Sequence, residues 1–201
     1  MTAVTPAAPR LVLADRILPR HLVTDITLVV LGAALVGGLA QLYVPLWPVP
    51  VTGQTLAVLL VGASLGAVRG ALAMVVYAVV GIVGVPWFSE ASSGWQVIAG
   101  PTGGYIIGFV FSAFLVGWLS ERHWDRKLLK ALALFLGGSV VVFAFGLPWL
   151  SFALGTDLPT TLEYGLWPFI VGGVIKSAIA AGLLPLAWWG AAKLSKTRDG
   201  A

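Results

Sequence analysis

The chain has 201 residues, of which 59% are hydrophobic and only 10% are charged. Soluble domains carry about 25% charged residues, so this composition excludes an ordinary soluble domain with a polar surface. The absence of cysteine excludes disulfides and thiolate metal sites. His21 and His123 both lie in charged stretches, so no metal centre and no cofactor are expected.

The first 23 residues precede any long apolar run and contain Arg10, Asp15, Arg16 and Arg20. We interpret 1–23 as a cytoplasmic segment. The apolar run that follows is long enough to span a membrane and has no small-residue cleavage site after it. We therefore expect a membrane helix there and not a signal peptide.

Six apolar runs follow one another along the rest of the chain, and about 20 mostly apolar residues span the hydrocarbon core. We predict an all-α integral membrane protein, a single bundle of six transmembrane helices over 24–192, with a tail at 193–201. A tight turn at Arg69-Gly70 is expected to separate the second and third helices. The predicted spans are 24–44, 54–69, 70–88, 103–119, 131–150 and 167–191.

The basic residues are distributed asymmetrically. Eleven of the twelve fall before the first run, after the last, or in the even-numbered connections, and the loops 45–53, 89–102 and 151–166 contain no lysine or arginine. Basic residues favour the cytoplasmic side. We therefore expect both termini in the cytoplasm of a bacterial inner-membrane protein. The net charge of +4 then reflects topology and does not indicate nucleic-acid binding.

The twelfth basic residue is Lys176, about nine residues into the last run. A lysine at that depth costs about 2.5 kcal/mol or more unless it is paired or wet, and such residues mark functional sites. No acid lies within 167–182. Its candidate partners are Glu90 or Glu163 from outer loops, backbone carbonyls, or a ligand. The alternative is a lysine that snorkels to the interface.

Two outer loops have the composition of a binding site. The segment 45–54 has three prolines, which fix an extended backbone. The segment 84–105 combines aromatic residues with glycines, which let the backbone approach a ligand closely. We expect these loops to cover a pocket that contains Lys176, although interfacial turns and an aromatic belt would also explain them.

No catalytic motif accompanies this pocket. The sequence has no phosphate-binding loop, no serine nucleophile with a plausible base, and no carboxylate pair within the apolar runs. We therefore expect a binding protein and not an enzyme. Acids that could relay protons within the runs are also missing, which indicates a subunit that takes its energy from partners.

Three segments, 48–56, 84–88 and 100–105, resemble the BioY family in their sequence, order and separation. This family comprises the biotin-specific substrate-binding subunits, or S components, of energy-coupling-factor (ECF) transporters. The resemblance covers the whole membrane region. It implies biotin as the transported ligand, bound by Thr52, Gln54, Trp87, Phe88, Gly100, Pro101, Thr102, Gly103, Tyr105, Gly173 and Lys176.

The chain departs from the family pattern at two points. The family's last helix usually carries an aspartate three residues before the lysine, and Gly173 stands there instead. The sequence also contains no asparagine that could contact the biotin ureido group. Gln54, Thr52, Thr102, Tyr105 or loop backbone could substitute. Lys176 could neutralise the biotin carboxylate or donate to the ureido oxygen, and both remain open at this stage.

The resemblance also implies a transmembrane coupling subunit and two cytoplasmic ATPases as partners. Small residues spaced by four let helices approach closely. The stripe of Ala33, Ala34, Gly37 and Gly38 resembles the face that S components use for docking, although packing within the molecule would also explain it. The alternatives are an S component for another vitamin, a carrier that works without ATPases, and a non-transporting scaffold.

Overall fold

The computed structural model describes residues 12–199, with side chains described for 12–193. Arg10, the rest of 1–11 and residues 200–201 lie outside this range. The described chain is mostly helical, with one short hairpin. Its helices are α1 Leu13–Ile17, α2 Leu22–Ala40, α3 Gln54–Leu65, α4 Ala67–Ile82, α5 Trp95–Ala99, α6 Gly103–Ser120, α7 Leu128–Leu154, α8 Leu158–Gly165 and α9 Trp167–Asp199, with 3₁₀ turns η1 Ser89–Ala91 and η2 Trp124–Arg126, and strands β1 Tyr43–Val44 and β2 Val51–Thr52.

Four of the described helices, α2, α6, α7 and α9, are long and apolar enough to cross a membrane. Helices α3 and α4 are apolar but shorter, with 12 and 16 residues. Each predicted span overlaps one of these six helices in the expected order. Three predicted spans end too late, because α2 ends at Ala40, α3 at Leu65 and α4 at Ile82.

The turn between α3 and α4 lies at Gly66, whose φ of 89° is in the region that favours glycine. The predicted turn at Arg69-Gly70 is therefore wrong. Arg69 belongs to the first turn of α4, and its guanidinium donates to Asp25 at 2.8 Å and to Asp15 at 2.7 Å. These ion pairs connect α4 to α1 and α2.

Helix α6 lies in the centre of the bundle and packs on α3, α4 and α7. Glycines make this packing close. A Cβ added at Gly62 would lie 2.7 Å from the Ala113 carbonyl oxygen, and one at Gly108 would lie 3.0 Å from the Val142 carbonyl oxygen. These glycines therefore bring backbones together within the molecule.

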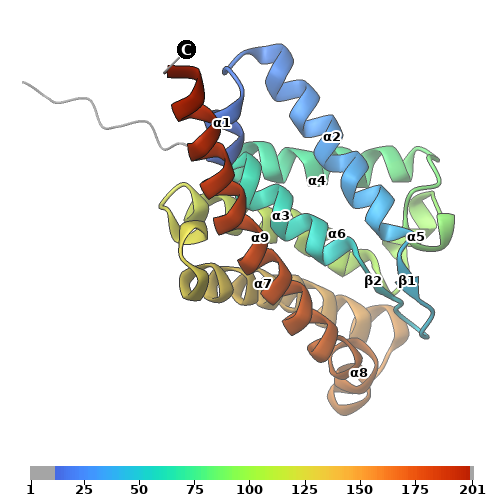
Figure 1. Ribbon diagram of the computed structural model, residues 1–201. Coiled ribbons are helices and arrows are strands. Elements are labelled where there is room, and N and C mark those ends of the chain that lie inside the picture. The colour runs from blue at the N-terminus through green and yellow to red at the C-terminus, as the bar shows by residue number, and fades with distance from the viewer. Residues whose placement is uncertain (1–11, 200–201) are drawn as a thin grey trace, which may run out of the picture.

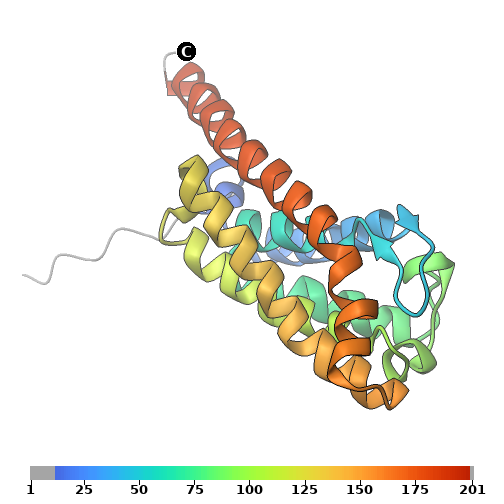
Figure 2. The same cartoon turned by 90° about the horizontal axis from the view of Figure 1, so that it is seen from below.

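The connections separate to two ends of the bundle (Figures 1 and 2). The hairpin, α5 and α8 gather at one end, whereas α1, η2 and the last turns of α9 gather at the other. In the hairpin, Tyr43 pairs with Thr52 and Val44 with Val51. The candidate site lies at the hairpin end.

Candidate functional site

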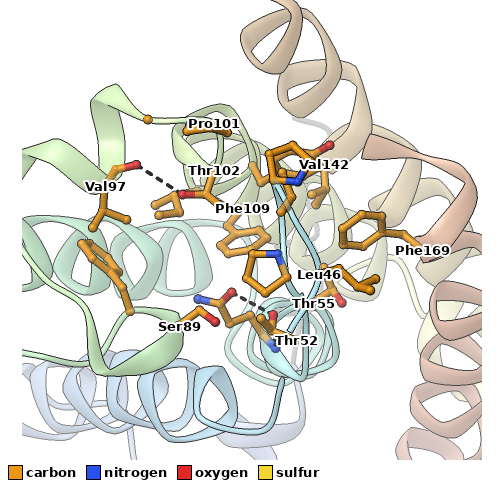
Figure 3. A pocket seen from close by; sticks show the side chains of 18 of the residues that line it. Leu46, Thr52, Thr55, Ser89, Val97, Pro101, Thr102, Phe109, Val142 and Phe169 are labelled. Carbon is orange, nitrogen blue, oxygen red and sulfur yellow. Dashed lines mark hydrogen bonds between the residues drawn. The ribbon is translucent and has the colours of Figure 1, made fainter. Parts of the chain in front are cut away.

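A cavity of about 350 Å³ lies at the hairpin end of the bundle, with walls from the hairpin loop, the segment before α6, and helices α7 and α9. This volume falls in the range of about 300–1,000 Å³ found for small-molecule sites. Figure 3 shows Leu46, Thr52, Val142 and Phe169 converging on it from different elements. Nine predicted site residues line it: Thr52, Gln54, Phe88, Gly100, Pro101, Thr102, Tyr105, Gly173 and Lys176.

Lys176 reaches this cavity from α9. Its ammonium group donates to the Thr52 carbonyl oxygen at 2.5 Å and to the Thr55 hydroxyl at 3.1 Å. Neither oxygen carries a charge, and Lys176 forms no ion pair within residues 12–193. Of the partners considered from sequence, the structure brings a backbone carbonyl to Lys176. Glu90 lines the cavity and Glu163 does not.

A series of side-chain hydrogen bonds begins at the same loop. The Thr52 hydroxyl donates to Gln54 Oε1 at 2.8 Å, and Gln54 Nε2 donates to the Tyr77 hydroxyl. Thr52 and Gln54 are both buried. A carboxamide carries two donors and an acceptor with two lone pairs, so Gln54 keeps capacity for a ligand after these two bonds.

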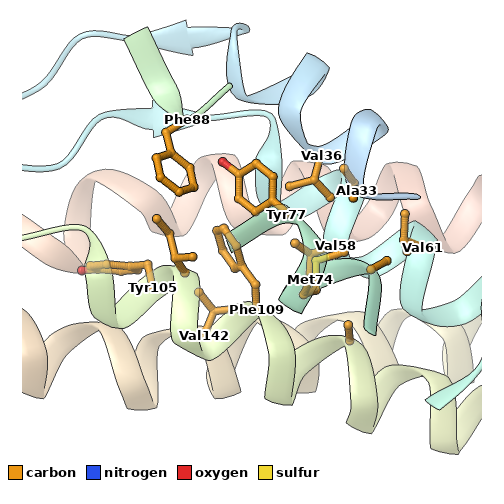
Figure 4. Close-up of a cluster of buried hydrophobic side chains, with 14 of the residues drawn as sticks. Ala33, Val36, Val58, Val61, Met74, Tyr77, Phe88, Tyr105, Phe109 and Val142 are labelled. Atoms are coloured by element: carbon orange, nitrogen blue, oxygen red, sulfur yellow. The ribbon is translucent and has the colours of Figure 1, made fainter. Parts of the chain in front are cut away.

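Aromatic rings form the apolar walls. Phe88 is only 1% exposed and meets Tyr77 edge to face, with ring centroids 5.3 Å apart. Tyr105 stacks on Phe169 with centroids 6.1 Å apart, and its hydroxyl donates to the Gly165 carbonyl oxygen at 2.9 Å. Figure 4 shows Phe88, Tyr105 and Phe109 within the buried cluster, and all three also line the cavity. These flat surfaces suit a compact apolar ligand.

Two predicted contacts do not reach the cavity. The Trp87 ring packs on Gly37, where an added Cβ would lie 3.0 Å from the ring, and its Nε1 donates to the Tyr77 carbonyl oxygen. Gly103 begins α6, and its Cα lies against the backbone of Ile98. Trp87 and Gly103 are therefore absent from the cavity lining and lie behind its walls.

The proline-rich loop forms the cover of the site. Residues 46–50 line the cavity, and the peptide bond between Trp47 and Pro48 is cis. The Trp47 ring meets Tyr164 of α8 edge to face, with centroids 5.5 Å apart. The expectation that this loop covers a pocket containing Lys176 is consistent with this arrangement.

Several lining residues were missed from sequence. Ser139, Val142 and Phe143 come from α7, and Phe169 comes from α9. Helical spacing was the available signal, since Phe169, Gly173 and Lys176 are spaced by four and three residues and share one face. No polar residue of distinctive type marks the lining face of α7, so that helix has no comparable signal.

The predicted docking stripe is divided between two faces of α2. Ala33 and Gly37 are buried, whereas Ala34 and Gly38 are exposed. An added Cβ at Gly32 would lie 3.0 Å from Val61, but one at Gly38 would meet nothing within 4 Å. Figure 4 shows Ala33 pointing into the core. Ala33 and Gly37 therefore pack within the molecule, and of the four predicted docking residues only Ala34 and Gly38 lie on the exposed face of α2.

Comparison with known proteins gives a consistent result. The sequence profile described as BioY family matches residues 10–193. Similar proteins include the "Biotin transporter BioY" of Rhizobium etli, 37% identical over 167 residues, covering 78% of this chain and 89% of the relative. Another is "Biotin transporter BioY2" of Lactococcus lactis subsp. cremoris, 34% identical over 155 residues, covering 77% of this chain and 85% of the relative.

A solved structure is also similar to this one. It is the crystal structure of "the S-component for biotin from an ECF-type ABC transporter", with a TM-score of 0.73 and 26% identity, covering 81% of this chain and 89% of that chain. These similar proteins are named as transporters and not as enzymes, which confirms the expectation of a non-enzymatic protein.

Proposed function

Because the chain belongs to the BioY family, we propose that it is the biotin-binding subunit of an uptake system in the plasma membrane, and that biotin occupies the cavity beneath the hairpin loop. The observation that carries this proposal is the Lys176 ammonium group, held at the cavity wall by neutral oxygens. A cation in that position lacks a counter-charge that an anionic ligand would supply.

The chemistry of biotin matches the lining in three ways. Its fused apolar bicycle fits between aromatic walls such as Phe88 and Tyr105. Its ureido group donates and accepts hydrogen bonds, and the Gln54 carboxamide can accept and donate them in turn. Its carboxylate suits Lys176, to which we assign it in preference to the ureido oxygen. The N-terminus of α3, adjacent to Thr52, adds partial positive charge at the same place.

We further propose six membrane crossings over 24–192, with 1–23 and 193–201 in the cytoplasm. Four long apolar helices and the shorter α3 and α4 support this topology. Arg69 lies in the first turn of α4, Arg122 lies between α6 and η2, and Lys193 lies towards the end of α9. These segments are at the α1 end of the bundle, which the proposal places in the cytoplasm, where basic residues are favoured.

In this proposal a transmembrane coupling subunit and two ATPases drive transport, because the cavity lining includes no pair of acidic residues that could relay protons. The exposed face of α2 at Ala34 and Gly38 would receive the coupling subunit, since small residues permit close helix contact. An S component for another vitamin, or a carrier without ATPases, would keep the same fold.

The test compares the wild type with K176A and K176Q, using biotin and its methyl ester as ligands. A charge-assisted hydrogen bond contributes about 1.5–3 kcal/mol, so both variants should bind biotin at least about tenfold more weakly. The methyl ester has no charge, so its weaker binding should change little between wild type and variants. Isothermal titration in detergent measures these affinities.

Three outcomes separate the alternatives. Unchanged biotin binding by K176A refutes the role of Lys176. Equal losses for biotin and its ester indicate that Lys176 contacts the ureido group instead. A thermal-shift panel of riboflavin, thiamine and biotin identifies the vitamin, and stabilisation by a vitamin other than biotin overturns the proposed ligand.

A further inference from the structure

A single side chain outside the cavity lining, that of Gln41, binds four backbone groups. Gln41 directly follows α2. The two N–H groups of its Nε2 are shared among three carbonyl oxygens, those of Gly37 at 3.1 Å, Trp87 at 3.2 Å and Phe88 at 3.0 Å. Its Oε1 accepts from the Ala91 amide at 3.1 Å. Three of these four groups belong to the segment 87–91, which lies 46 or more positions later in the sequence.

The segment 87–91 forms part of the cavity wall through Phe88, Ser89 and Glu90. Two of its residues have a backbone conformation that side chains disfavour, with φ of 62° at Glu90 and 51° at Ala91. Left-handed conformations at non-glycine residues persist only when the surrounding structure holds them, and they concentrate at ligand sites. The Ala91 amide that Gln41 binds belongs to this strained pair.

Other contacts fix the start of the segment but not its strained part. The Trp87 indole donates to the Tyr77 carbonyl oxygen at 2.9 Å, and the Phe88 ring lies on Gly81 of α4. Within the loop, the Ser92 hydroxyl donates to the Ser89 carbonyl oxygen at 2.6 Å. Among these contacts, the bond from Ala91 to Gln41 directly joins the strained pair to a transmembrane helix.

We propose that Gln41 is a positioning residue for ligand retention, which ties the segment 87–91 to the end of α2 and so keeps this wall closed on the occupant. This inference rests on the proposed function, with biotin as the occupant. Gln41 touches no ligand itself. Loss of its bonds lets Ser89 and Glu90 move away from the cavity, and the bound molecule then leaves faster.

The test uses the full chain in detergent, with wild type, Q41A, Q41E and a matched control, T27A. Q41A removes all four bonds. Q41E keeps an acceptor for the Ala91 amide but sets a carboxylate against three carbonyl oxygens. Thr27 also bonds a backbone carbonyl from α2, that of Val23, far from the cavity, so T27A loses a similar bond on the same helix.

Two measurements are made on each protein. The first is the dissociation rate of labelled biotin after addition of excess unlabelled biotin. The second is amide hydrogen exchange in a peptide covering 85–96, with a peptide from α7 as reference. We expect Q41A and Q41E to release biotin about tenfold faster, with faster exchange confined to 85–96, while T27A matches the wild type in both.

The outcomes are distinct. Dissociation from Q41A and Q41E at the wild-type rate overturns the inference. Faster exchange in the α7 peptide as well shows general destabilisation and also overturns it. If the wild-type protein does not bind biotin, the proposed function fails and the inference with it, whereas wild-type binding with unaltered release from the variants overturns the inference alone.

Discussion

Lys176 of α9 donates a 2.5 Å hydrogen bond to the backbone carbonyl oxygen of Thr52, at the start of the segment that leads from β2 into α3. A membrane-embedded cation thus joins the last helix to the hairpin by way of a neutral group. Lys176 forms no ion pair within residues 12–193, so changes that alter the local charge should alter ligand affinity without rebuilding the fold.

The first prediction concerns Gly173, which precedes Lys176 by three residues on the same helix face. An added Cβ at Gly173 meets nothing within 4 Å, so a longer side chain fits. We expect G173D to weaken biotin binding roughly tenfold, about 1.4 kcal/mol, because its carboxylate neutralises Lys176 and repels the ligand carboxylate. The uncharged G173N is the control and should bind within about twofold of wild type. Equal affinities for both variants would contradict the assignment of the ligand carboxylate to Lys176.

The second prediction concerns the exposed face of α2. A34W and G38W should bind biotin normally but reduce ATP-dependent uptake in proteoliposomes about tenfold, as expected if the docking interface loses about 1.4 kcal/mol. V68W is the control, because Val68 is exposed on a different helix, α4, and should transport like wild type. Wild-type uptake by both α2 variants would show that the coupling subunit docks elsewhere.

The third prediction concerns Gly81, where an added Cβ would lie 2.1 Å from the Phe88 ring. G81A should lower the free energy of unfolding by about 1–3 kcal/mol through overpacking, and it should displace the Phe88 wall. G137A is the matched control in α7, since its Cβ meets nothing within 4 Å. Alanine favours a helix over glycine, so G137A should melt at or above the wild-type temperature. A G81A protein as stable as wild type would be the contrary result.

The fourth prediction concerns Asp125 of η2, which is fully buried and accepts a 2.5 Å hydrogen bond from the Trp188 indole. Burial raises the pKa of Asp125 above its ordinary value, and the bond from Trp188 opposes this shift without cancelling it. The folded protein then holds a proton that the unfolded chain releases near its ordinary pKa of 3.8. The stability that Asp125 contributes therefore falls as pH rises from 3.8 through the raised pKa.

D125N tests this dependence, because asparagine keeps an acceptor for Trp188 and does not titrate. Between about pH 4 and pH 8, the melting temperature of wild type should fall relative to that of D125N. Arg126 and His123 also face Asp125, and both proteins retain them. A constant difference between the two melting curves across this range would exclude Asp125 as the titrating group.

Apolar runs predicted the order of the helices well, because the bilayer requires long apolar segments wherever the chain crosses it. Lys176 was predictable for the same reason, as the one cation within such a run. It was harder to predict which of two adjacent residues faces the cavity. Phe88 lines the cavity and Trp87 does not, because packing on Gly81 and Gly37 decides which ring turns inward.

The two faces of α2 could not be distinguished from sequence either. Apolar residues occur on every side of this helix, so its sequence has no polar face that would distinguish buried Ala33 from exposed Ala34. No feature of the sequence indicated a role for Gln41. Its partners are backbone groups 46 or more positions away, and only the folded chain brings them within hydrogen-bonding distance.

The shortness of α4 has a consequence for the surrounding lipid. Its 16 residues rise about 24 Å at about 1.5 Å per residue, several ångströms less than a hydrocarbon core of about 30 Å. Exposed Val68, Leu72 and Val79 show that this helix faces outward along its length. In the proposed six-crossing topology, acyl chains beside α4 would compress, and we expect the protein to partition toward thinner bilayers.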